Sequence, residues 1–312
     1  MGLDSCHLCP RACGADRTKA AGFCHASDSL EVASVCLHRG EEPPLNPIVN
    51  IFFAHCNLQC IYCQNHQIST AERAKWEPIS VDTLADQIAE NIKKSNSLTI
   101  KQSGNPLVGF VTAAHYAHHI PEIVHAIRHK GFNPTFVYNS SGYESVNTLR
   151  SLEGLIDIYL PDYKYADSQL AAAYSHAPDY PEVAYDAIRE MIRQVGSGLK
   201  VDESGTAYRG LIVRHLVLPG HTENSVQVLD RLADLTSPLP PFSLHLSLMA
   251  QYYPPRTDLP SPLDRKLTHD EYSTVVDHAQ DLGLIAGWIQ ELDASDNYRP
   301  NFENADSPFQ NL

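Results

Sequence analysis

The stretch that decides the fold reads Cys56-Asn57-Leu58-Gln59-Cys60-Ile61-Tyr62-Cys63-Gln64-Asn65, and it directly follows the short apolar run around 51–53. Three cysteines with three and two residues between them fit on one loop around one compact group. A [4Fe–4S] cluster normally takes four thiolates, so three leave one iron open to a ligand from outside the chain. A structural zinc site is the competing interpretation, and it would need a fourth protein ligand. The spacing therefore favours a reactive iron–sulfur centre held by Cys56, Cys60 and Cys63.

A second group of cysteines lies near the amino terminus, at Cys6, Cys9, Cys13 and Cys24. The start of the sequence shows no export signal, which favours metal binding over disulfides. Four thiolates are enough to close a tetrahedral zinc site or to saturate a second [4Fe–4S] cluster. The spacing alone does not choose between these two metals.

Outside the cysteine groups, apolar runs of strand type alternate with amphipathic helical patterns six or seven times. This alternation predicts a parallel sheet with helices outside it, either doubly wound or barrel-like. A capping box at Thr268–Glu271 marks the start of the last helix. The predicted strands cover about residues 51–53, 107–112, 135–138, 156–160, 211–218, 243–249 and 284–289, and the predicted helices cover 81–94, 121–130, 145–152, 181–195, 225–235 and 270–281.

Polar side chains follow several of these strands. Cys56, His115, Asn139, Asp162 and Gly220 all come after the carboxyl end of a predicted strand. In parallel α/β folds this edge of the sheet carries the active site. We therefore expect these residues to lie close together.

The composition excludes several classes of protein. Of the 312 residues, 43% are hydrophobic, which supports a sizeable core and rules out global disorder. No apolar run is long enough for a membrane helix, so we expect a cytoplasmic protein with no membrane partner. The formal net charge is −14, which argues against nucleic acid as a partner because phosphate backbones bind basic surfaces.

The pattern Cys-x3-Cys-x-aromatic-Cys, with Tyr62 as the aromatic residue, resembles the radical SAM superfamily. That resemblance implies a partial (βα)6 barrel of the TIM-like type, an α/β fold. It also implies a [4Fe–4S] cluster whose open iron binds S-adenosyl-L-methionine. One electron then cleaves this cofactor to a 5′-deoxyadenosyl radical, which abstracts hydrogen from a substrate.

Further segments narrow the resemblance to the pyruvate formate-lyase activating enzyme group, and within it to the PflX-like branch. They include the Cys9-Pro10-Arg11 motif, Glu41-Glu42-Pro43 and the stretch 214–220. Tyr62 and Asn65, which flank Cys63, belong to the pattern and are predicted to lie at the cofactor.

Two later segments match the family by position. Asn139 and Ser141 occupy the place of a family segment that lies near the methionine end of the cofactor, although this chain has Asn139 where the activating enzymes have aspartate. Asp162 and Lys164 match the family's Asp-x-Lys, in which the lysine pairs with the cofactor carboxylate and the aspartate orients it. Side chains two apart on a strand point to the same side, as this pairing requires.

The sequence departs from the family after the second predicted strand, where the usual Gly-Gly-Glu segment that holds the cofactor amino group is absent. We expect His115 or Thr112 to replace it. Arg214, His215, Gln251 and Tyr252 are candidates for the wall of the substrate cavity.

These observations predict three parts of the chain. Residues 1–45 form a short cysteine-rich metal-binding module, 46–291 the partial barrel, and 292–312 a polar acidic tail. The expected activity is that of a radical SAM oxidoreductase acting on an unidentified substrate, with activation of a protein or peptide partner to a glycyl radical as one form of it and an electron donor as a second partner. The competing interpretation is a catalytically degenerate iron–sulfur or zinc protein that serves in interactions, which the missing Gly-Gly-Glu keeps open.

Overall fold

A single sheet organises the protein, and its parallel strands follow one another in chain order. The computed structural model describes residues 3–69, 76–98, 105–237, 239, 243–296, 299–304 and 308–309. In the described part the sheet order is β1-β2-β3-β4-β5-β7-β8-β9, with β6 paired to β7 alone. The parallel strands are β2 (Ile48–Phe53), β3 (Leu107–Val111), β4 (Thr135–Ser140), β5 (Ile158–Pro161), β7 (Ala207–Leu216), β8 (His245–Met249) and β9 (Gly287–Ile289).

This order decides between the two architectures that the sequence left open. A doubly wound sheet reverses its strand order at a switch point, whereas a barrel adds each strand beside the previous one. No reversal occurs among the described strands, so the fold is the predicted partial barrel. The sheet is open, because β1 and β9 lie at its two ends.

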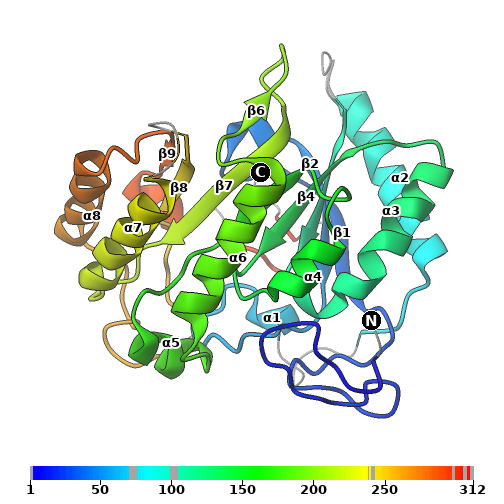
Figure 1. Ribbon diagram of the computed structural model, residues 1–312, viewed down its shortest axis with the longest axis horizontal. Helices are drawn as coiled ribbons and strands as arrows, with labels where there is room; N and C mark the ends of the chain where they lie inside the picture. Colours follow the sequence, from blue (N-terminus) through cyan, green and yellow to red (C-terminus); the bar gives the residue numbers. More distant parts are fainter. Residues whose placement is uncertain are drawn as a thin grey trace.

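The helices cover the outer face of this curved sheet, as Figure 1 shows for α2, α3, α4, α6, α7 and α8. Two helices begin with the caps that the sequence indicates. Ser80 accepts a hydrogen bond from the backbone N–H of Thr83, and Thr268 and Glu271 form the expected capping box. The helices are α1 (His66–Ser69), α2 (Val81–Leu98), α3 (Ile120–His129), α4 (Val146–Ser151), α5 (Ser168–Ser175), α6 (Tyr180–Val195), α7 (Thr222–Thr236) and α8 (His269–Asp281), with 3-10 turns η1 (Pro43–Leu45), η2 (Ala114–His119) and η3 (Leu292–Asp296).

The stretch 1–45, which the sequence assigned to a cysteine-rich module, contains a strand. β1 (Val32–His38) pairs antiparallel with β2 and extends the sheet at its edge. Buried and partly buried side chains alternate along most of β1, because one of its faces packs against the protein core. In so short an edge strand, the sequence shows this pattern only weakly. A second strand that the sequence did not indicate, β6 (Lys200–Val201), forms an exposed hairpin with β7.

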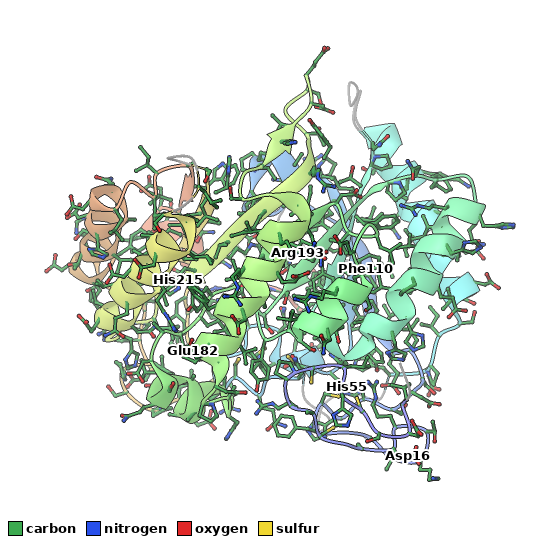
Figure 2. The ribbon with its side chains drawn as sticks, viewed as in Figure 1. Asp16, His55, Phe110, Glu182, Arg193 and His215 are labelled. Carbon is green, nitrogen blue, oxygen red and sulfur yellow. The ribbon has the colours of Figure 1, made fainter. Side chains whose placement is uncertain are left out.

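The main core lies between the sheet and the helices. Phe110 of β3 stacks on Phe136 of β4 with ring centroids 5.7 Å apart, and both side chains are fully buried. Figure 2 labels Phe110 in this layer, between the strands and the helices that cover them. Because parallel strands are buried on both faces, β3 reads as the continuous apolar run Leu-Val-Gly-Phe-Val.

Among the described helices, none combines the length and the apolarity needed to cross a bilayer.

The aromatic stack sets a test of this core. Phe110→Ala removes a fully buried ring and should lower the free energy of unfolding by about 3–5 kcal/mol. Ile285→Ala, at a side chain that is 58% exposed, should change it by less than about 0.5 kcal/mol. Denaturant unfolding of both variants measures the difference, and equal losses would place Phe110 outside the packed core.

Candidate functional site

One cavity collects most of the residues that the sequence singled out. Its lining comes from the carboxyl ends of the parallel strands and from the loop that follows β2. The residues that it brings together are Cys56, Cys60, Tyr62, Cys63, Asn65, Asn139, Ser141, Asp162 and Lys164.

The three cysteine sulfurs of this loop each accept a hydrogen bond from the protein. The Leu58 backbone N–H donates to Cys56 Sγ at 3.3 Å, Ser175 Oγ–H to Cys60 Sγ at 2.9 Å and Ser69 Oγ–H to Cys63 Sγ at 3.4 Å. Donors aimed at sulfur stabilise the thiolate form and tune a bound metal centre.

The electrostatics of the loop nevertheless keep the thiols protonated when no metal is bound. Burial raises the pKa of Cys60 to about 11, and it also raises the pKa values of Cys56 and Cys63. A bound metal deprotonates a coordinating thiol, so these side chains are suited to a cationic centre that supplies the missing charge.

The number of cysteines in the cavity limits the kind of centre that they suit. Cys56, Cys60 and Cys63 line it, and no fourth cysteine among the described residues does. A closed structural zinc site takes four protein ligands, whereas a [4Fe–4S] cluster held by three thiolates keeps one iron open. Three thiolates in an open cavity therefore suit a cluster of this kind.

The amino-terminal segment holds the cysteine loop in place. Arg11 Nε–H donates to the Asn57 carbonyl at 3.0 Å, and the same guanidinium donates to the Ser175 carbonyl at 3.1 Å. His55 Nε2 lies 2.5 Å from Glu31 Oε2 and has a left-handed φ of 71°. Figure 2 shows His55 at the end of the barrel that the amino-terminal loops cover.

The loops after β4 and β5 approach each other at Gly142. Its φ is 78°, and a Cβ there would lie 2.1 Å from the Asp162 carbonyl oxygen, so only glycine fits. The Tyr180 hydroxyl lies 2.7 Å from the Ser141 carbonyl and 3.0 Å from the Asp162 carbonyl, and it accepts a hydrogen bond from the Lys164 N–H. Tyr180 thus ties the two loops together, a role that no local sequence signal indicates.

Lys164 and Asp162 form the ion pair that the sequence predicted. Burial lowers the pKa of the Lys164 ammonium, but the charge of Asp162, and of the Cys60 and Cys63 sulfurs once they are ionised, outweighs it and leaves this pKa raised. Lys164 therefore stays charged beside the sulfur atoms, where it can bind an anionic group.

Strand β7 carries a second charged group beside Asp162, since Asp162 and Arg214 form a bridge between neighbouring strands. Arg214 Nε–H donates to Glu42 Oε1 at 2.8 Å, and an Arg214 Nη2–H donates to Glu41 Oε2 at 3.1 Å. Gln251 Nε2–H donates to the other oxygen of Glu41 at 3.2 Å. Arg214 and Gln251, both candidates from the sequence, line the cavity. Glu41 and Glu42 line it too, although their sequence motif alone did not indicate this.

The structure does not bring every predicted residue to the cavity. His115 is buried outside its lining, and its Nε2–H donates to the Ala54 carbonyl at 2.7 Å. Thr112, the alternative replacement for Gly-Gly-Glu, does line the cavity and has a left-handed φ of 58°. His215 and Tyr252 also lie outside the lining, as do Cys6, Cys9, Cys13 and Cys24.

The stretch expected as an acidic tail contributes to the wall. Pro300 and Phe309 line the cavity, and the Phe309 ring lies 4.3 Å from that of His38. Phe302 packs against Phe52 with ring centroids 5.2 Å apart. These described parts of the tail are packed against β1 and β2.

Comparisons with known proteins agree with the architecture. No protein-family model matches the chain. It is 28% identical over 286 residues to an uncharacterised protein of Methanocaldococcus jannaschii, which covers 90% of this chain and 75% of that protein. The fold is similar to the FeFe-hydrogenase maturase HydG from Carboxydothermus hydrogenoformans, with a TM-score of 0.50, 12% identity and 78% of this chain covered.

The alignment spans 53% of that maturase, so this chain corresponds to about half of its length. A methylornithine synthase, PylB, aligns with a TM-score of 0.43 and 12% identity, over 72% of this chain and 59% of that one. The likeness to the maturase shows the fold.

A buried carboxyl after β4, that of Glu144, makes the stability of the folded protein depend on pH. Ser140 Oγ–H and Tyr138 O–H donate to Glu144, but burial dominates and raises its pKa from 4.5 to about 7. Between these values the folded protein keeps a proton that the unfolded chain loses, so stability falls as the pH rises through this window, by about 3 kcal/mol in total.

Glu144→Gln cannot titrate and should lack that fall. Urea unfolding of both proteins at several pH values across the window measures the difference. Parallel pH profiles for the two proteins would contradict the buried, protonated state of Glu144.

Proposed function

We propose that this protein is a radical SAM enzyme, which binds a [4Fe–4S] cluster on Cys56, Cys60 and Cys63. The observation that carries the proposal is the cavity itself: three hydrogen-bonded sulfurs share it with a charged lysine, and no fourth cysteine lines it. The fold shared with the hydrogenase maturase and the resemblance of the cysteine pattern both support it.

When bound, S-adenosyl-L-methionine on the open iron supplies a 5′-deoxyadenosyl radical that abstracts hydrogen from the substrate. The protein's own part is to orient the cofactor and to keep water away from it. Lys164 presents a cation for the cofactor carboxylate, and Asp162 fixes the position of that cation. Asn139 and Ser141, on the loop that Tyr180 holds, offer polar groups at the same wall.

Tyr62 links the cysteine loop to the rest of the barrel. Its hydroxyl lies 2.6 Å from that of Tyr165, which lies 2.8 Å from Ser175 Oγ, the donor to Cys60. This chain of hydroxyls fixes one sulfur ligand from the buried side. Its hydrogen bonds position Cys60 and are expected to tune the potential of the cluster.

The resemblance extends the proposal to an activity like that of the pyruvate formate-lyase activating enzymes, in which a protein or peptide partner receives a glycyl radical. An external one-electron donor would be the second partner. Glu41, Glu42 and Arg214 are the residues that we propose face this substrate.

The cluster assignment predicts a clear loss of activity. After anaerobic reconstitution and with dithionite as reductant, the parent should release 5′-deoxyadenosine from S-adenosyl-L-methionine. Cys63→Ala should abolish this release because it removes a cluster ligand. Cys36→Ala, which removes a buried thiol on β1 outside the cavity, should keep it. Release by Cys63→Ala at the parental rate would mean that these cysteines hold no catalytic cluster.

The cofactor pose predicts a separate loss of affinity. Lys164→Ala should weaken S-adenosyl-L-methionine binding about 10- to 150-fold, which corresponds to ~1.5–3 kcal/mol for a charged hydrogen bond, without loss of iron. Lys130→Ala is the matched control, because Lys130 pairs with Asp86 on the outer helices. Equilibrium binding and iron analysis of both variants test this. If Lys164→Ala bound S-adenosyl-L-methionine as tightly as the parent, Lys164 would have only a structural role.

A further inference from the structure

Four cysteines are not used by the proposed activity, and they lie together in the amino-terminal loops. Cys6, Cys9 and Cys24 are buried, Cys13 is exposed, and all four are free thiols. Backbone hydrogen bonds close the turns that carry them, with the Cys6 N–H donating to the Ala15 carbonyl at 2.9 Å. The loops that carry them stand at the end of the barrel where α1 lies (Figure 1).

Two of these sulfurs approach the same point. A Cβ built on Gly22 would lie 3.3 Å from Cys13 Sγ and 3.9 Å from Cys24 Sγ. The other two lie in the same neighbourhood, because Cys6 and Cys9 are both within electrostatic reach of Cys24.

Four thiolates are the full ligand set of a [4Fe–4S] cluster, in which each sulfur binds a separate iron. They would also close a tetrahedral zinc site, so the metal content of the protein decides between the two.

A buried arginine indicates that this group is negatively charged. Arg17 is 1% exposed, and its guanidinium donates to the carbonyls of Ser27 and His115 and lies 4.0 Å from Cys6 Sγ. No Asp or Glu among the described residues forms an ion pair with it. A buried cation without a counter-charge is costly, and a metal centre bound by four thiolates carries the opposite charge.

We propose that Cys6, Cys9, Cys13 and Cys24 bind a second [4Fe–4S] cluster, with Arg17 as its buried counter-ion. This site lies outside the cavity and has a full set of four protein ligands, so it does not rest on the activity proposed for the first. With no open iron, it holds a cluster that does not bind a small-molecule ligand.

Metal analysis of the full chain after anaerobic reconstitution with iron and sulfide tests the proposal. The triple variant Cys56→Ala, Cys60→Ala, Cys63→Ala keeps the amino-terminal cysteines and should still bind about four irons and no zinc, with the Mössbauer spectrum of a [4Fe–4S] cluster. Cys9→Ala with Cys24→Ala in the parent background should lose about four irons. Cys36→Ala is the matched control and should lose none.

Two results would overturn the proposal. About one zinc per chain and no iron in the triple variant, as isolated and after reconstitution, would mean a structural zinc site. No metal in that variant would mean that these cysteines are not ligands. Neither result bears on the site at Cys56, Cys60 and Cys63, which is tested by the release of 5′-deoxyadenosine by the parent.

Discussion

The burial of three thiols at the end of strand β2 is the constraint on which the rest of the site depends. Burial raises the pKa values of Cys56, Cys60 and Cys63, so as free groups they would be protonated and poor ligands. A cationic centre reverses this preference, and the fixed donors from Leu58, Ser175 and Ser69 then have a charge to stabilise. The Lys164 cation adds to this field from the loop after β5.

The amino-terminal segment makes the geometry of that loop possible. Arg11 reaches across 46 residues to the Asn57 carbonyl and across 164 residues to the Ser175 carbonyl, so one side chain fixes both the cysteine loop and the donor to Cys60. Asn57 also connects the two cysteine groups, because its side chain lies 4.0 Å from Cys56 Sγ and hydrogen-bonds with Cys9. Loss of order in the amino-terminal loops should therefore disturb the cavity, although these loops do not supply its cysteines.

The sequence was informative where the signal is local. Continuous apolar runs predicted the buried strands, periodicity predicted the helices, and the spacing of Asp162 and Lys164 placed them on one side of the β5 end. Contacts between distant segments left no such signal, which is why the tie made by Tyr180 and the clamp made by Arg11 emerged only from the structure. Strand β1 was missed because an edge strand of seven residues has little periodicity to read. His115 follows a strand as expected, but its turn directs the ring to Ala54 and away from the cavity.

The charges around the cavity also restrict what can enter it. Lys164 is paired with Asp162, and Arg214 is shared by Glu41 and Glu42, so the polar wall carries one more negative than positive charge. Arg214 offers no free charge for an anion, because both carboxylates already accept its hydrogen bonds. At Arg214, an anionic group would have to displace a buried carboxylate, which is costly. A neutral or cationic group meets no such barrier at Arg214.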